Sequence, residues 1–207
     1  MGARFLDDEA RAAFKQAIEA VENASAVEVV VAVRRRSARH GHANVAIGAV
    51  LAFVGLAAML YASHTFSLSS ILIDPFVVAV LGGAAVELLP FVKRWLTTPA
   101  ARRRHVTRAA RATFVERGVH NTTGRSGILV YISWLEREVA LVPDIGIAAA
   151  VPEGALAKLE NQLTAAMRGG GAAVAKQLEA SAAVLAAAMP HRDDDVNELP
   201  DALDEGT

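Results

Sequence analysis

Two long apolar stretches interrupt an otherwise mixed pattern of hydrophobic and polar positions. Residues 43–62 carry no charge and match the roughly 20 residues that a helix needs to cross a bilayer. Residues 71–92 form a second stretch, with Glu87 near one end and Asp74 near the other, where Pro75 suits a first helical turn. Because an ordinary core helix keeps a polar face, two transmembrane helices are favoured over two buried helices of a soluble protein. Acidic side chains near helix ends reach water, so both acids are interpreted as structural rather than as an ion pathway.

The flanking charges predict the orientation of these stretches. Arginines precede the first stretch and Lys and Arg residues follow the second, whereas residues 63–70 between them contain neither. Because positive residues stay on the cytoplasmic side, both termini are predicted to be cytoplasmic. The basic residues expected at the membrane surface are Arg34, Arg35, Arg36, Lys93, Arg94, Arg102, Arg103 and Arg104. They either set the topology alone or also bind anionic headgroups.

The remaining pattern predicts a small α/β domain. Phe14, Ile18 and Val21 recur at helical spacing behind Asp7, a residue type that caps helices. Residues 26–33 are short, apolar and β-branched, as in a strand covered on both faces.

Beyond the second apolar stretch, the pattern predicts a helix, a strand hairpin and two further helices. A helix over residues 99–117 ends at Gly118. Strands over 127–133 and 139–144 flank a turn at 134–138 and form an antiparallel hairpin. The last predicted elements are helices over 152–167 and 172–189 and an acidic, disordered tail over 191–207.

The first strand needs partners, and only the residues after 99 supply them. Residues 1–39 and 99–190 are therefore predicted to form one domain, into which the transmembrane hairpin of residues 43–92 is inserted. An even number of crossings returns the chain to the same side, which agrees with the charge bias.

Composition removes several functional classes. The chain has no cysteine, which excludes disulfide scaffolds, cysteine-based zinc sites and thiol catalysis. The net charge of −1 hides a segregation, because arginines gather in the middle and the end is acidic. The basic residues lack interleaved aromatics, so the expected surface partner is the lipid bilayer and no nucleic acid is expected. No local arrangement marks a nucleophile with its base, and no catalytic residue is identified.

The segments "AIEAVENASAVEVVVAV" and "TFVERGVHNTTGRSGILVYISWLEREVALVPDIGIAAAVP", followed by two helices that close on "LAAAMP", resemble the TPM domain, whose name joins thylakoid-lumen, photosystem-II-repair and MOLO proteins. The similarity is greatest to the bacterial membrane-protein branch of that family. The residues with the most specific pattern are Arg125, Gly127, Ser133, Glu136, Arg137, Asp144 and Gly146.

The resemblance implies an α/β/α sandwich around a small mixed sheet, interrupted here by the hairpin, in a bacterial cytoplasmic (inner) membrane. Acid phosphatase activity and calcium binding are associated with plant relatives, while other relatives look like accessory factors for membrane complexes. This chain lacks a targeting peptide and carries its spans inside the domain. Both departures argue against transferring the phosphatase activity.

Candidate chemistry follows from the predicted strand order. A right-handed crossover makes the first two strands parallel, and the third then runs back. This places Glu28, Arg125 and Asp144 at one end of the sheet, with Arg34 and the turn at 134–138 at the other end, toward the membrane. The two carboxylates are candidate ligands of calcium or magnesium, and Arg125 is a candidate binder of an anionic group. The alternative is that they are ordinary strand-end carboxylates, one of them paired with Arg125.

Two functional classes remain. The first is a membrane-anchored interaction or accessory module whose cytosolic domain binds another membrane or cytosolic protein, and the absence of a catalytic constellation favours it. The alternative is a divalent-cation-dependent phosphatase, which needs at least one more acidic ligand than the pattern places.

Overall fold

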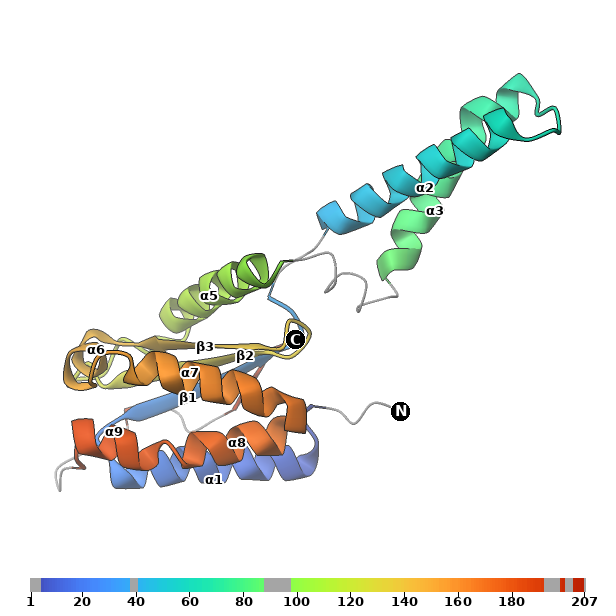
Figure 1. Ribbon diagram of the computed structural model, residues 1–207. Coiled ribbons are helices and arrows are strands. Elements are labelled where there is room, and N and C mark those ends of the chain that lie inside the picture. Colours follow the sequence, from blue (N-terminus) through green and yellow to red (C-terminus); the bar gives the residue numbers. More distant parts are fainter. Residues whose placement is uncertain (1–4, 38–40, 88–97, 192–197, 200–202, 207) are drawn as a thin grey trace. The chain divides into compact units, whose positions relative to one another are not determined.

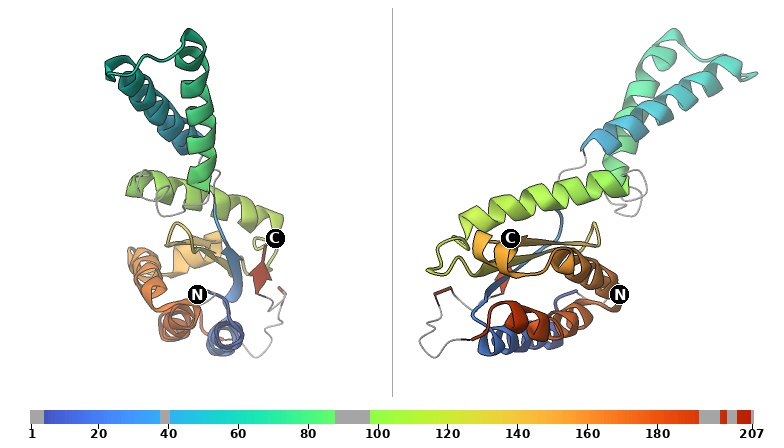
Figure 2. Two further views of the ribbon diagram at one scale, coloured as in Figure 1. Left: turned by 90° about the vertical axis from the view of Figure 1, so that its right-hand side faces the viewer. Right: turned by 60° about the vertical axis from the view of Figure 1, so that its left-hand side comes forward.

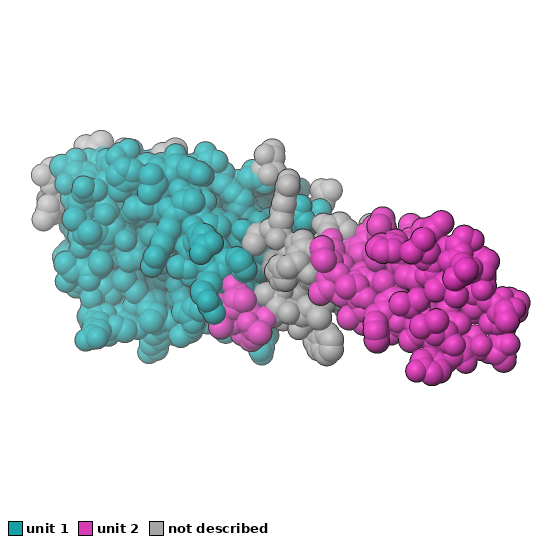
Figure 3. All heavy atoms as spheres, turned by 90° about the horizontal axis from the view of Figure 1, so that it is seen from above, with its two compact units in different colours: residues 1–38, 102–207 teal, residues 39–101 magenta. Residues whose placement is uncertain are grey.

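The computed structural model describes residues 5–37, 41–87, 98–191, 198–199 and 203–206. The chain divides into two compact units (Figure 3). Residues 1–38 and 102–207 make the first unit, and residues 39–101 make the second. The elements follow one another (Figure 1) in the order α1 (Asp8–Ala24), β1 (Glu28–Arg34), α2 (Gly41–Tyr61), α3 (Leu68–Glu87), α5 (Pro99–Glu116), β2 (Gly127–Ser133), β3 (Glu138–Pro143), α6 (Ile145–Ala150), α7 (Ala155–Ala166), η1 (Met167–Gly169), α8 (Gly171–Glu179), α9 (Ala182–Ala188) and β4 (Asp204–Glu205).

A small mixed sheet lies at the centre of the first unit, with its strands in the order β3-β2-β1-β4. β1 and β2 are parallel, from Glu28 beside Gly127 to Arg34 beside Ser133. β3 returns antiparallel to β2. The predicted mixed α/β class, the parallel pairing of the first two strands and the antiparallel hairpin are therefore confirmed.

One face of the sheet carries the larger hydrophobic cluster. Val31 of β1 and Val130 of β2 pack there with Phe14 of α1, Leu163 of α7 and Leu178 of α8, all of them buried. Successive strand residues point to opposite faces, so this cluster uses alternate positions of each strand. Complete burial of a side chain such as Phe14 stabilises the fold by about 1.5–3 kcal/mol relative to its exposure.

The opposite face carries a second cluster beneath α5. Val30 of β1 and Leu129 of β2 pack with Val106 and Ala110 of α5. Figure 2 shows α5 over this face and α1, α7 and α8 over the other. Strands covered on both faces explain why β1 and β2 have continuous apolar runs rather than an alternating pattern.

Local capping fixes two helix ends that the sequence predicted. The Asp7 side chain accepts a hydrogen bond from the backbone N–H of Ala10 (2.8 Å) and begins α1. At the end of α5, Gly118 has a φ of 65°, and the next N–H, of Val119, bonds back to the Phe114 carbonyl (3.1 Å). This is a Schellman ending, which requires the left-handed conformation that glycine tolerates.

Two C-terminal elements differ from the predicted pattern. α6 follows β3 directly and was not predicted, and α7 begins at Ala155 rather than at residue 152. The predicted helix over 172–189 is two helices, α8 and α9. Between them, the hydroxyl and the N–H of buried Ser181 both donate to the Leu178 carbonyl, at 2.5 and 2.9 Å. Such local bonds compete with the regular helical ladder, which explains the break.

The outer edge of β3 is covered by side chains of α7. Glu160 accepts from the N–H of Leu141 (3.0 Å), and the Thr164 hydroxyl accepts from the N–H of Val139 (3.1 Å). The spacing of four residues on α7 presents both acceptors on the same helix face. The edge strand thus has its free N–H groups occupied rather than open to another chain.

The acidic C-terminal segment adds the fourth strand. β4 runs parallel to β1, with Asp204 beside Ala32 and Glu205 beside Val33. Leu199 is 9% exposed and joins the cluster beneath α5. This differs from the disordered tail that composition predicted, because a few apolar residues and a short backbone pairing dock the described part of the segment.

The second unit is a pair of helices, α2 and α3, which pack against each other (Figure 1). A Cβ added at Gly48 of α2 would lie 2.4 Å from the carbonyl oxygen of Ala79 on α3, so glycine permits the close approach. α3 begins earlier than predicted, so Pro75 lies inside the helix and not in its first turn. Both helices are long and apolar enough to cross a membrane, and their windows Asn44–Tyr61 and Leu68–Ala85 are almost entirely unburied.

Candidate functional site

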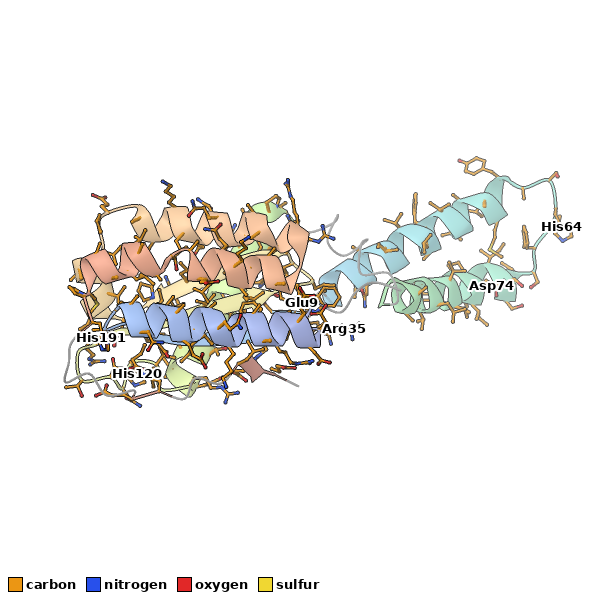
Figure 4. The ribbon with its side chains drawn as sticks, turned by 90° about the horizontal axis from the view of Figure 1, so that it is seen from below. Glu9, Arg35, His64, Asp74, His120 and His191 are labelled. Atoms are coloured by element: carbon orange, nitrogen blue, oxygen red, sulfur yellow. The ribbon has the colours of Figure 1, made fainter. Side chains whose placement is uncertain are left out.

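The sheet of the first unit has polar residues at both ends. The Glu28 end comprises the starts of β1 and β2 and the finish of β3, with Glu28, Arg125 and Asp144. The Arg34 end comprises the finishes of β1 and β2 and the turn that follows, with Arg34 and Glu136. Figure 4 shows His120, which precedes β2, and Arg35, which follows β1, at opposite extremes of this unit.

Glu28 and Asp144 lie at the same end, as the parallel pairing predicts. Glu28 stands beside Gly127 in the register, and the N–H of Asp144 donates to the Gly127 carbonyl (2.8 Å). Neighbouring strands are about 4.8 Å apart, so the backbones of Glu28 and Asp144 are roughly 10 Å apart across β2. A Cβ at Gly127 would lie 2.1 Å from the carbonyl oxygen of Val119. The loop before β2 therefore packs over Gly127, between the two acidic residues.

Each of the two carboxylates holds backbone N–H groups. Glu28 is 6% exposed and accepts from the N–H groups of Glu198 and Leu199, both at 3.4 Å. Asp144 is 5% exposed and caps α6 by accepting from the N–H of Ile145 (2.8 Å). The alternative of structural strand-end carboxylates thus has direct support, since both acids already have donors.

Arg125 joins this end from the loop before β2. It has a φ of 51°, donates to the His120 carbonyl (2.9 Å) and lies 3.5 Å from an Asp144 carboxylate oxygen. About half of its side chain is exposed, so the guanidinium retains a surface that an anion can reach. A Cβ at Gly146 would lie 2.6 Å from the carbonyl oxygen of Arg125, which explains why this loop packs against the start of α6 only with glycine there.

The described residues provide no further metal ligand beside Glu28 and Asp144. Among the residues that the structure describes, no group of three or more His, Cys, Asp or Glu side chains is placed to hold an ion. The ring of His120 lies 6.1 Å from the Phe114 ring, and its buried Nδ1 has no hydrogen-bond partner among the described residues.

The Arg34 end contains a buried polar network. Glu136 is 2% exposed and accepts from the N–H of Ser37 (3.1 Å) and from the hydroxyl of fully buried Ser133. The hydroxyl of Ser37 reaches that of Tyr131 (3.4 Å). Burial raises the pKa of Tyr131 above that of a free phenol, which is itself protonated at neutral pH. The network ties the turn after β2 to the segment that leaves β1.

The predicted membrane-surface arginines have different environments. Arg34 is largely buried and pairs with Asp204 of β4 (2.5 Å), whereas Arg35, Arg36 and Arg104 are exposed. Arg103 pairs with Glu160 of α7 (2.5 Å), and Arg102 is partly buried. Lys93 and Arg94 lie outside the described residues.

The contribution of the C-terminal segment to both ends of the sheet was not predicted from the sequence. Glu198 and Leu199 lie at the Glu28 end, and Asp204 lies at the Arg34 end. A usable signal was present, because Leu199 and Leu203 are apolar residues within an otherwise acidic run. Glu136 was named as part of the turn and of the family pattern, but its burial was not predicted, since burial of a turn residue has no periodic signature.

No protein-family model matches the chain, and a search of curated proteins finds no match. Among solved structures, the fold is similar to the NMR structure of the BA42 protein from the psychrophilic bacterium Bizionia argentinensis. The TM-score is 0.59 at 16% sequence identity, and the similarity covers 100% of this chain and 99% of that one. At this identity, the similarity concerns the fold alone.

Proposed function

We propose that this chain is a membrane-anchored protein whose cytosolic α/β domain acts as an interaction or accessory module for a membrane complex. The observation that carries the proposal is the exposure of α2 and α3. Large apolar side chains such as Phe53 and Phe76 are 72% and 71% exposed. Exposed apolar surface on this scale marks a membrane or protein contact, and the helix lengths fit a bilayer.

The orientation follows from charge. Basic residues flank the hairpin on both sides in the sequence, and residues 63–70 between the helices contain no Lys or Arg. The hairpin is thus a two-helix anchor with both termini in the cytoplasm, and the bilayer is the first partner. The resemblance to the bacterial branch of the TPM domain supports a bacterial cytoplasmic membrane and an α/β/α sandwich interrupted by this anchor.

The domain has the features of a binding module more than those of an enzyme. The alternative, a divalent-cation-dependent phosphatase acting on an unknown substrate with calcium or magnesium, relies on Glu28 and Asp144. Both side chains hold backbone N–H groups, and the described residues add no third ligand. We therefore place the activity of the domain in protein contacts.

Alkaline carbonate extraction of cell membranes tests the anchor. We expect the full chain to stay in the membrane pellet together with an integral marker. A chain that moves to the supernatant with peripheral markers would overturn the anchor.

Crosslinking in native membranes, followed by mass spectrometry, tests the interaction role. We expect recurrent crosslinks from exposed lysines of the domain, Lys15, Lys158 and Lys176, to one membrane or cytosolic protein. A phosphatase assay with calcium or magnesium separates the alternatives. Phosphatase activity lost in Asp144→Asn would contradict the interaction role.

A further inference from the structure

The outer edge of β1 holds an acidic segment of the same chain. We call this segment the docked tail; its described residues are Glu198, Leu199, Leu203, Asp204, Glu205 and Gly206. Its described residues pair with β1 at two positions, Asp204 beside Ala32 and Glu205 beside Val33. A parallel strand added at a sheet edge is the geometry by which many domains bind extended peptides.

Three arginines from three elements converge on the two acidic residues of β4. Arg34 of β1 donates to the Asp204 carboxylate (2.5 Å) and to its backbone carbonyl (2.8 Å). Arg117, just after α5, donates to the other carboxylate oxygen of Asp204 (2.6 Å). Arg11 of α1 makes two bonds to Glu205, at 2.6 and 3.0 Å. We call Arg11, Arg34 and Arg117 the arginine clamp.

The clamp belongs to the folded domain and not to the tail. Without an acidic occupant, it would leave three like charges around one strand edge, which is unfavourable. Paired carboxylates accept such guanidinium donors in charge-assisted bonds, so the edge is complementary to an acidic peptide.

Two apolar side chains of the tail reach opposite faces of the sheet. Leu199 enters the cluster beneath α5, and Leu203 packs against the cluster formed with α1. At the Glu28 end, Glu28 accepts from the N–H groups of Glu198 and Leu199, and the Glu198 carboxylate accepts from the N–H of Thr123 (2.6 Å). The domain thus contacts the backbone as well as the side chains of the peptide.

Gly206 adds a steric requirement. A Cβ at this position would lie 2.4 Å from Nε and 2.5 Å from Cζ of Arg34, so the backbone of Gly206 lies close to this side chain. Arg34 is held by Asp204 and cannot swing away without loss of those bonds. The edge of β1 therefore favours glycine directly after the two acids.

We propose that the outer edge of β1, with the arginine clamp, is a docking surface for an extended acidic peptide of a partner protein, with the pattern Glu-Leu-x-x-x-Leu-Asp-Glu-Gly. The chain's own tail occupies this surface in cis. This inference rests on the proposed role as an interaction module and names its binding surface. A tethered occupant has an effective concentration on the order of millimolar, so a partner must compete with it or act when it is released.

Fluorescence anisotropy of the purified full chain in detergent measures peptide binding to this docking surface. The probe is a fluorescein-labelled peptide with the sequence of residues 198–207. In the Asp204→Lys/Glu205→Lys variant, the new lysines face the clamp and release the tail. We expect this variant to bind the peptide at least tenfold more tightly than the wild type. Glu153→Lys/Glu179→Lys, at exposed acids elsewhere, serves as the matched control and should bind like the wild type.

Two further changes, one in the protein and one in the peptide, test the specificity of peptide binding. Addition of Arg34→Glu to the released-tail variant should weaken peptide binding at least tenfold, and a peptide with valine in place of the final glycine of the pattern should bind equally poorly. Gly206→Val in the full chain is a second way to displace the tail by steric conflict alone. It provides the same measurement should the lysine variant fold poorly.

Equal peptide affinity in the wild type and both released-tail variants, or binding unaffected by Arg34→Glu, would overturn the inference. So would a wild-type dimer that is lost in the released-tail variants, because the occupant would then be the tail of a second copy. Peptide binding is measured independently of membrane extraction. A docking surface that binds no peptide and a chain that is not anchored in the membrane therefore give different results.

Discussion

Glu136 is the buried acid that ties together the Arg34 end of the sheet. Its carboxylate accepts from the N–H of Ser37 and from the hydroxyl of Ser133, and both Glu136 and Ser133 are almost inaccessible to water. A buried donor that loses its acceptor costs about 1–3 kcal/mol, whereas a retained acceptor oxygen limits the loss.

We expect Glu136→Ala to destabilise the domain by roughly 1–3 kcal/mol, because two donors lose their acceptor. Glu136→Gln keeps one oxygen and should lose less. Urea unfolding in detergent, followed by tryptophan fluorescence, measures both variants, with exposed Glu153→Ala as control. Equal stabilities of Glu136→Ala and Glu153→Ala would show that the network contributes nothing.

The carboxylates of the docked tail make its docking to β1 dependent on pH. The hydrogen bonds to Arg11 lower the pKa of Glu205, and those to Thr123 lower the pKa of Glu198. Among the described residues, the other charged groups in contact with this tail are Arg34, Arg117 and Glu28, together with Asp204 within the tail and Asp8, which pairs with Arg11. A carboxylate whose pKa is lower in the docked tail than in the released tail stabilises docking fully above its pKa in the released tail, about 4.3. This contribution is lost as the pH falls through the lower pKa of the docked tail.

The tail should therefore be docked at neutral pH and released as the pH falls below about 4. The chain has no native cysteine, so Thr207→Cys accepts a single spin label. We expect the label's mobility in electron paramagnetic resonance spectra to rise as the pH falls below about 4. Mobility that rises toward alkaline pH instead would contradict the assignment of these carboxylates.

At the scale of elements, two glycines of α2 have opposite environments. A Cβ at Gly48 would meet the Ala79 carbonyl oxygen at 2.4 Å, and backbone atoms cannot yield without separating the helices. A Cβ at Gly55 would have no heavy atom within 4 Å. The same substitution at the two positions therefore isolates helix packing from helix propensity.

Gly48→Ala should lower the thermal midpoint of the protein in detergent micelles, followed by circular dichroism, while Gly55→Ala should leave it unchanged or raise it slightly. The physical reason is the lost close approach of α2 and α3. A larger loss for Gly55→Ala than for Gly48→Ala would mean that the two helices do not pack through Gly48.

Elements with strong local signals were predictable. β1 and β2 are continuous apolar runs. Asp7 and Gly118 mark helix ends because aspartate is favoured before a helix and glycine directly after one. α6 was missed because Asp144 reads equally well as a strand end and as a helix cap. The break between α8 and α9 depends on the side chain of Ser181, which no hydrophobic period records.

At the scale of the whole molecule, the sheet order was within reach of sequence reasoning and the docked tail was not. The right-handed crossover places Glu28 and Asp144 at one end of the sheet without any knowledge of side chains. Their partners come from Glu198, Leu199 and the start of α6, and the arginine clamp draws on α1, β1 and the end of α5. Contacts among segments so distant in sequence arise only from tertiary packing.

We propose that the hairpin of α2 and α3 anchors a domain whose two sequence halves lie on the same side of the membrane. β1 precedes the hairpin and β2 follows it, and the two strands pair along their length. Such pairing is incompatible with an odd number of crossings.

Paired topology reporters, one fused after Thr207 and one inserted between Ser63 and Ser67, test this orientation. Each fusion is scored with an enzyme active only in the cytoplasm and with one active only outside it. We expect a cytoplasmic signal after Thr207 and an external signal from the loop between α2 and α3. An external signal after Thr207, or a cytoplasmic signal at both positions, would contradict it.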